Sequence, residues 1–208
     1  MPILYLWQFL FVSIFGTFLH FSYDITNHFF IFSILGAVNE STWEHIKMGI
    51  FPWFIWFYIR AQYYSYPNTY FGNFIAVLIF ILTICIVYYG LKLIINKTNK
   101  YILLLHINSF YIGVGLGSYL EYYINTLKLG KNFEFIGIIG CLTFILCALL
   151  WTYYPAKFFL VLDERMGAYG IKVHPRRCFN KNGNILLKVY NKLSNKLLFN
   201  RKEMKNKK

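Results

Sequence analysis

Long apolar runs alternate with short polar segments along most of the chain. A helix needs about 20 mostly apolar residues to cross the hydrocarbon core of a bilayer. Five runs approach this length, and Tyr and Trp gather at several of their ends, as is typical of membrane interfaces. The pattern predicts five transmembrane helices, at about residues 4–21, 48–62, 73–91, 101–124 and 135–154.

The segment "ITNHFFIFSILGAV", residues 25–38, is too short to span a bilayer and too apolar for an ordinary loop. It is interpreted either as a short sixth helix or as a re-entrant piece, which must be covered by protein or water. Pro52 should kink the second predicted helix or lie near its start. The predicted fold is therefore all-α: a polytopic integral membrane protein with five transmembrane helices and this short sixth or re-entrant segment.

Composition supports a membrane protein over a soluble one. Of the 208 residues, 58% are hydrophobic, 22% aromatic and only 14% charged, whereas a soluble domain carries about 25% charged residues. The N-terminal "MPILYLWQFLFVSIF" lacks a basic region and a small-residue cleavage site, which indicates a first span and not a signal peptide. The four cysteines form no CxxC pair, which argues against a disulfide framework or a zinc ribbon.

Positive charge is concentrated at the C-terminus. Residues 1–154 hold 7 Lys/Arg and 5 Asp/Glu, whereas residues 155–208 hold 14 and 3. We therefore divide the chain into a transmembrane domain (1–154), an interfacial segment (155–180) and a basic amphipathic tail (181–208). This bias predicts a multi-pass protein of the cell membrane with a cytoplasmic C-terminus. The bilayer and its anionic headgroups are the expected partners of the tail, and nucleic acid is not expected because no recognition motif accompanies the charge.

The positive charges of two short loops also bear on that orientation. Lys97 and Lys100 precede the fourth span and, with five spans, share the cytoplasmic side with the tail. Lys128 and Lys131 would then lie outside, against the positive-inside rule. Five spans place the N-terminus outside, and six would place it inside.

The stretch "VNESTWEHIK", residues 38–47, has the features of a helix start. Asn39 is a good N-cap residue, and Ser41 followed by Glu44 forms a capping-box pattern. A carboxylate in the first turn is also favoured by the helix dipole. On this structural interpretation, the charges simply begin the second transmembrane helix.

The same stretch has a functional interpretation. Glu40 and Glu44 are at i and i+4, so on one helix they would share a face, with His45 beside it. Two carboxylates and an imidazole can bind a divalent metal or act as general acid and base. The order of these residues is not the HExxH pattern of metalloproteases.

Three more ionisable residues, His20, Asp24 and His28, lie upstream in "LHFSYDITNH". Their spacing of four would align them in one stripe if the helix were continuous. Such a stripe could supply metal ligands, or one ligand oriented by a carboxylate. Since Ser, Asp, Thr and Asn also favour loops, the alternative is that the helix ends near Phe21.

Polar residues also lie inside the fourth predicted span. Four residues of the run 101–124 fall near one helix face: His106, Gly113, Gly117 and Glu121. The two glycines form a GxxxG motif, which permits close helix packing. An ionisable residue within a span is a functional candidate, although Glu121 could instead snorkel to the surface.

Two separated stretches carry a family resemblance. "LHFSYD" followed by "VNESTWEHIKMGIFP", and later "YYPAKFFLVLDERMGAYGI", resemble a bacterial membrane family catalogued as domain of unknown function 6512. The resemblance covers about residues 15–171, but Ala156 stands where a second Pro is expected and no Pro follows Asp163. It implies a membrane protein without indicating an activity. The matching positions are His20, Tyr23, Asn39, Glu40, Ser41, Trp43, Glu44, His45, Lys47, Pro52, Asp163, Gly167, Tyr169 and Gly170.

Three function classes stay open at this point. The first is a metal-dependent membrane hydrolase for a lipid or lipid-linked substrate, with Glu44 and His45 as catalytic groups. Its candidate ligands for a divalent metal are His20, Asp24, Glu40, Glu44 and His45. The second class is a small transporter with a path through intramembrane polar groups, namely Asp24, His106 and Glu121. The third is a non-catalytic assembly partner whose polar residues are separately satisfied.

Overall fold

The computed structural model of the chain describes residues 3–64, 68–94, 99–127, 129–164 and 166–171. The amphipathic helix predicted over 181–208 lies outside these ranges, as does the last part of the interfacial segment. The last long helix ends at Tyr153, next to the predicted boundary at 154, and the division into domains stays a prediction.

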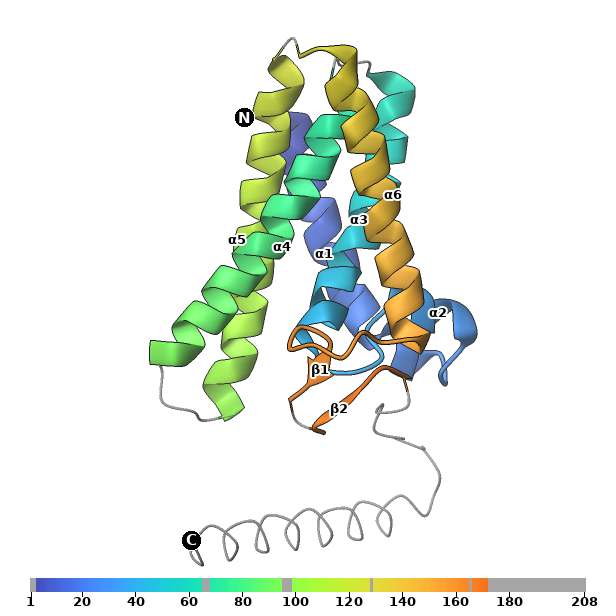
Figure 1. The fold of residues 1–208 in the computed structure, drawn as a ribbon, viewed down its shortest axis with the longest axis vertical. Helices are drawn as coiled ribbons and strands as arrows, with labels where there is room; N and C mark the ends of the chain where they lie inside the picture. Colours follow the sequence, from blue (N-terminus) through green and yellow to red (C-terminus); the bar gives the residue numbers. More distant parts are fainter. Residues whose placement is uncertain (1–2, 65–67, 95–98, 128, 165, 172–208) are drawn as a thin grey trace, which may run out of the picture. The chain divides into compact units, whose positions relative to one another are not determined.

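In the described residues, five long helices run in alternating directions and a short one lies beside their ends (Figure 1). Their bounds are α1 Ile3–Ile25, α2 Phe30–Leu35, α3 Thr42–Tyr63, α4 Thr69–Ile94, α5 Asn99–Thr126 and α6 Lys131–Tyr153. α4 packs on α5 and α6, and α1 packs on α3 and α5. The last turns of α1, α4 and α6 share one end of the bundle with the first turn of α3. We call it the hairpin end, because the strands described below lie there (Figure 1).

Three of the described helices, α1, α4 and α6, are long and apolar enough to cross a membrane. The other two long helices, α3 and α5, carry much of the buried polar chemistry, including Glu44, Lys47 and Glu121. These side chains face other helices, which lowers the apolar content of α3 and α5 without exposing charge. The helical class is confirmed, and crossing of the membrane by each of the five long helices stays a prediction.

The ambiguous segment 25–38 contains the short helix α2, which is packed against protein on one side. Lys47 Nζ donates to the Ser33 carbonyl at 3.0 Å, and the Ser33 and Tyr153 hydroxyls are hydrogen-bonded. The chain leaves α2 at Gly36, where an added Cβ would lie 2.5 Å from the Leu19 carbonyl oxygen. Only glycine permits this close approach of α2 to α1.

The GxxxG motif of α5 packs closely, as predicted. A Cβ on Gly117 would lie 2.7 Å from the Ala76 carbonyl oxygen of α4, and one on Gly113 would lie 3.1 Å from the Phe80 carbonyl oxygen. Phe80 and Trp53 are fully buried at this contact. The missing side chains therefore let α5 approach the backbone of α4.

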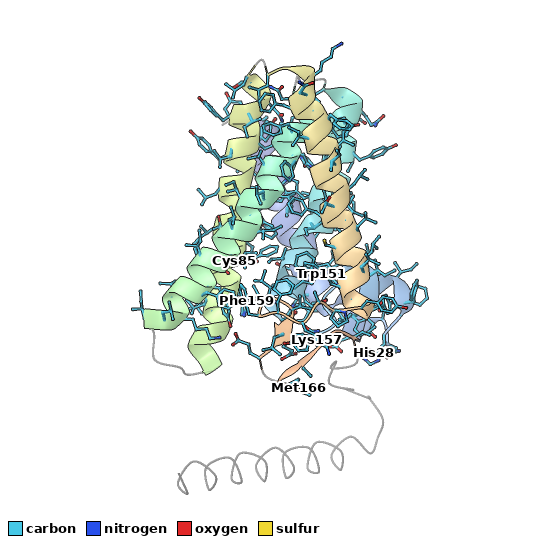
Figure 2. All side chains as sticks on the ribbon, in the orientation of Figure 1. His28, Cys85, Trp151, Lys157, Phe159 and Met166 are labelled. Atoms are coloured by element: carbon cyan, nitrogen blue, oxygen red, sulfur yellow. The ribbon has the colours of Figure 1, made fainter. Side chains whose placement is uncertain are left out.

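The closing segment, residues 154–171, contains a small hairpin that the sequence pattern did not predict. Strand β1 (Leu162–Asp163) pairs antiparallel with β2 (Ala168–Tyr169), with Leu162 opposite Tyr169. Asp163 accepts the N–H of Met166, which is labelled in Figure 2, at 3.1 Å, and Gly167 has a φ of 66°. An Asp that accepts a turn N–H and a glycine at positive φ are the usual chemistry of a tight turn.

Candidate metal site

The first turn of α3 sets the geometry around the predicted motif. Ser41 is the N-cap, and its Oγ accepts the Glu44 N–H at 3.3 Å. The Ser41 N–H is donated to Asn39 Oδ1 at 2.9 Å. Glu40 therefore lies in the loop before the helix, so the expectation that Glu40 and Glu44 share a helix face is wrong.

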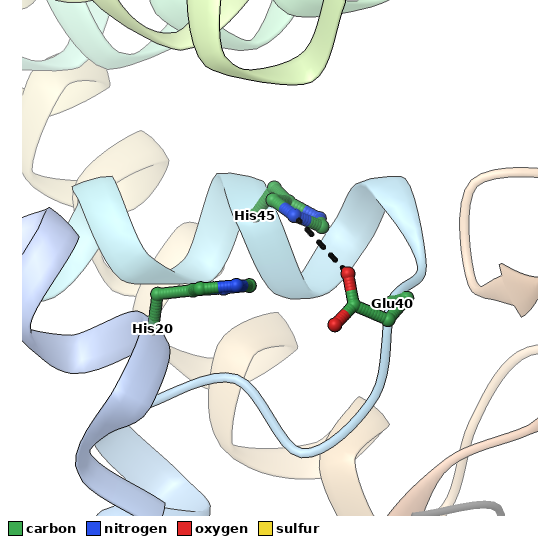
Figure 3. Close-up of side chains that lie close together, drawn as sticks. All are labelled: His20, Glu40 and His45. Atoms are coloured by element: carbon green, nitrogen blue, oxygen red, sulfur yellow. Dashed lines mark ion pairs between the residues drawn. The ribbon is translucent and has the colours of Figure 1, made fainter. Parts of the chain in front are cut away.

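Three of the predicted metal ligands come together at the hairpin end. His20 comes from α1, Glu40 from the loop before α3, and His45 from the first turn of α3 (Figure 3). One potential ligand atom from each residue lies within 4.8 Å of the others, and His45 Nε2 is 3.8 Å from Glu40 Oε2. His45 is buried, whereas His20 and Glu40 are partly exposed, so the cluster lies at the edge of the bundle.

Hydrogen bonding defines which nitrogen of His45 is available to a metal. His45 Nδ1 lies 2.8 Å from the Ser41 carbonyl oxygen. A carbonyl oxygen can only accept, so Nδ1 carries the proton, and the neutral ring has its lone pair on Nε2. That nitrogen is the one directed at Glu40. A backbone carbonyl in this position is a common means of orienting a metal-binding imidazole.

Ring stacking supports His45 from its other side. The His106 ring of α5 stacks on the His45 ring at a centroid distance of 4.4 Å and an angle of 13°. The Tyr88 ring of α4 stacks in turn on His106, at 3.8 Å. His106 thus belongs to a ring stack behind the cluster.

Glu44 is directed away from the cluster, into the protein. Its carboxylate accepts the Val38 N–H at 2.9 Å and pairs with Lys47 at 2.7 Å. Lys47 also donates to Thr152 Oγ1 at 2.9 Å, and both charged side chains are buried. The catalytic role predicted for Glu44 is therefore not supported by its position, because the carboxylate is engaged in joining α3 to its own N-terminal loop and, through Lys47, to α6.

The predicted stripe of His20, Asp24 and His28 is not continuous. Helix α1 ends at Ile25, and His28 follows with a left-handed φ of 65°. His28 Nε2 lies 3.7 Å from Asp24 Oδ1, with both side chains about one-third exposed. His28 leaves the stripe because the helix stops after Ile25. Asp24 pairs with His28 and is not part of the cluster.

Glu121 belongs to a separate buried network. It forms an ion pair with Arg60 in which both side chains are fully buried. Gln8 Nε2 and Trp53 Nε1 donate to its Oε2 at 2.6 and 3.0 Å. The roles of Arg60 and Gln8 were missed from sequence, although an Arg at the end of an apolar run is a recognisable signal.

A family model described as "Family of unknown function (DUF6512)" matches residues 3–171. The chain belongs to this family. The match spans the cluster, the loop before α3 and the closing segment, which confirms the resemblance noted from the two sequence motifs. Searches of curated proteins and of solved structures found no match.

In this DUF6512 chain the two separated sequence motifs contact each other. Asn39 Nδ2 donates to the Gly170 carbonyl at 3.1 Å, and the backbone N–H of Trp43 donates to the Leu160 carbonyl at 2.8 Å. Asp163 Oδ2 accepts the Glu40 N–H at 3.0 Å. The closing segment therefore packs directly on the loop that carries Glu40. Sequence spacing did not indicate that Asp163 would bind the backbone of this loop.

Proposed function

We propose that this protein crosses the membrane several times and binds a divalent transition metal on His20, Glu40 and His45, with which it hydrolyses a lipid or lipid-linked substrate. The observation that carries the proposal is the convergence of the three side chains from separate segments, with His45 Nε2 already directed at Glu40. Two imidazoles and a carboxylate form a donor set found in catalytic zinc sites.

The spacing of the donor atoms suits a small metal ion. Bonds of about 2.0–2.2 Å in tetrahedral geometry place neighbouring donor atoms about 3.4 Å apart. His45 Nε2 and Glu40 Oε2 are 3.8 Å apart, and all three donor atoms lie within 4.8 Å of one another. Movements of about an ångström would close the set, and partly exposed Glu40 and His20 can move by side-chain rotation.

Three protein ligands leave a coordination position for water or substrate. When bound, the metal would supply a nucleophilic water near neutral pH and polarise the scissile carbonyl or phosphoryl group. His45 holds its orientation through the Ser41 carbonyl and the His106 ring. Partial exposure of His20 and Glu40 leaves one side of the set open to a substrate.

The surroundings favour a substrate with an apolar part. His20 is in the last turns of α1, which is apolar enough to cross a membrane, and the neighbouring Phe21 is exposed. Phe30 and Ile31 of α2 are exposed near the same end of the bundle. On the charge bias of the chain, this end faces the cytoplasm.

The transport alternative has less support. Glu121, its main candidate, is engaged by Arg60, Gln8 and Trp53 and is fully buried. A proton or ion path would need this carboxylate to exchange partners repeatedly, and each exchange would leave the Arg60 charge buried without it.

Metal content of the detergent-purified protein tests the proposal. Mass spectrometry should find stoichiometric zinc or another transition metal in the wild type, and its loss in His45→Ala and Glu40→Gln. His28→Ala is the matched control, because it removes an imidazole outside the cluster and should retain the metal. A folded wild type without metal, even after incubation with zinc, would reject the proposal. A metal-loaded protein is then assayed for release of headgroups or acyl chains from lipid vesicles.

A further inference from the structure

The loop that carries Glu40 is hydrogen-bonded to the closing segment, more than 100 residues away in sequence. Residues 36–41 form no regular helix or strand, so the loop backbone depends on contacts with neighbouring segments. Asn39 and Trp43 each contribute one hydrogen bond to residues 160–170, on either side of Glu40.

Within the closing segment, Asp163 is the residue that hydrogen-bonds to Glu40. One carboxylate oxygen accepts the Glu40 N–H at 3.0 Å, and the other accepts the Met166 N–H in the turn of the hairpin at 3.1 Å. Asp163 is only 1% exposed, and hydrogen bonds from backbone N–H groups to a carboxylate are among the stronger ones. The same carboxylate therefore ties the hairpin turn to the backbone of a proposed metal ligand.

We propose that Asp163 is a positioning residue that holds Glu40 in the metal site. This inference rests on the proposed function for its metal-binding consequence. Asp163 contacts the backbone of Glu40, so it acts through Glu40 and is not itself a ligand. It also gives a physical reason for the presence of two separated motifs in this chain, one carrying the ligands and the other holding their loop.

The substitution Asp163→Asn tests this role with little change in volume. The Glu40 and Met166 N–H groups meet different oxygens of Asp163. An asparagine has one acceptor oxygen and one NH₂ donor, so in the same position one of the two N–H groups would face the NH₂ group. The matched control is Glu134→Gln, because Glu134 also accepts a backbone N–H, that of Tyr70 at 2.9 Å, but lies in the first turn of α6 at the opposite end of the bundle.

Two readouts separate positioning from general stability. Cobalt(II) titration of the detergent-purified protein, followed by visible absorption, reports affinity and coordination. Asp163→Asn should weaken cobalt binding by about 10- to 100-fold, the usual effect of removing a group that orients a metal ligand. At the same cobalt concentration, the absorption of bound cobalt in Asp163→Asn should fall toward the level of Glu40→Gln, which lacks a ligand. Hydrogen–deuterium exchange without metal should be faster in residues 38–43 and unchanged in α5, and Glu134→Gln should change neither readout at the site.

Unchanged exchange in residues 38–43 overturns the inference, as does wild-type cobalt affinity in Asp163→Asn. If wild-type protein binds no cobalt, the proposed metal function fails. Faster hydrogen–deuterium exchange of residues 38–43 in Asp163→Asn would still show that Asp163 positions the Glu40 backbone. Asp163→Glu, which keeps the charge but lengthens the side chain, replaces Asp163→Asn if the latter does not fold. If neither variant folds, Asp163 serves folding as a whole, and the positioning role is rejected.

Discussion

At the residue scale, adjacent side chains in the first turn of α3 serve different parts of the molecule. Successive residues of a helix point about 100° apart, so Glu44 and His45 leave the helix in different directions. Glu44 meets Lys47 and the Val38 N–H in the protein interior. His45 meets Glu40, His106 and the Ser41 carbonyl. One turn thus combines a structural carboxylate with a candidate metal ligand.

This difference predicts opposite phenotypes for two Glu→Gln substitutions. Glu44→Gln leaves the Lys47 charge buried without its carboxylate, which should lower the free energy of unfolding by about 3–5 kcal/mol while metal is retained in the folded fraction. Glu40→Gln should abolish metal binding and change stability little, because its side chain is partly exposed. Denaturant unfolding and metal analysis of both variants check this. A stable, metal-free Glu44→Gln protein would contradict it.

Sequence spacing brought His20, Glu40 and His45 into the candidate set but could not separate them from Asp24 and Glu44. The i, i+4 argument assumes that both residues lie on a helix, whereas α3 begins at Thr42, after Glu40 and the N-cap Ser41. Likewise α1 ends at Ile25, before His28. Glu44 turns inward because it meets Lys47 and the Val38 N–H. Lys47 is itself held in the interior by Ser33 and Thr152, and these tertiary contacts cannot be seen from sequence spacing.

At the element scale, a buried ion pair joins α3 and α5. Arg60 and Glu121 are both fully buried, and Gln8 of α1 hydrogen-bonds to each of them, which links three helices. Breaking a buried pair from one side is costly, whereas replacing both partners by apolar residues is often tolerated.

We therefore expect Glu121→Gln to destabilise the protein by about 3–5 kcal/mol. The double substitution Arg60→Met with Glu121→Leu should recover much of this loss, because no charge then remains buried. Unfolding by SDS titration in mixed micelles measures both variants. Near-wild-type stability of Glu121→Gln would show that the ion pair contributes little to stability, and Glu121 would again be a functional candidate.

Close contact between α6 and α4 predicts a different response from two glycines. A Cβ at Gly137 of α6 would lie 2.4 Å from the Phe71 backbone nitrogen of α4, which cannot move aside alone. Gly137→Ala should therefore cost about 1–3 kcal/mol or more by overpacking. Gly90→Ala is the control, since nothing lies within 4 Å of that Cβ, and it should be neutral or stabilising by up to about 1 kcal/mol. The same unfolding assay compares them, and equal effects would contradict the contact.

The helices were more predictable than their polar ends. Apolar runs indicate all five long helices, and a helix that crosses a membrane is expected to be apolar on both its lipid-facing and its core-facing side. Helix α3 begins at Thr42, directly after its N-cap Ser41, as the capping pattern predicted. The apolar run begins only at about residue 48, because the first turn of α3 is polar and faces protein. The hairpin was missed because strands of two residues, such as Leu162–Asp163, carry no alternation that a pattern can detect.

At the scale of the whole molecule, the alternating helices define two ends with different chemistry. The hairpin end carries the proposed metal site, and Lys92 at the end of α4 pairs there with Glu164 of the closing segment. The far end carries the loop between α5 and α6, which includes Gly130. If all five long helices cross the membrane, the two ends face opposite compartments. The positive charge of residues 155–208 predicts that the hairpin end is then the cytoplasmic one.

Thiol labelling in intact cells tests this arrangement. Single cysteines are introduced at two exposed positions, Gly130→Cys at the far end and Lys157→Cys at the hairpin end, after the four native cysteines are replaced by serine or alanine. A membrane-impermeant maleimide should label Gly130→Cys in intact cells and Lys157→Cys only after permeabilisation. The cysteine-free parent controls for background labelling.

Each other labelling pattern has a definite structural meaning. Labelling of both positions from outside would mean that an even number of spans separates Gly130 from Lys157, so that α6, the one long helix between them, does not cross. The reverse pattern would keep the crossing of α6 but place the hairpin end outside, where the metal site would meet lipids of the outer leaflet. The expected pattern places His20, Glu40 and His45 at the cytoplasmic interface and directs substrate assays to lipids of the inner leaflet.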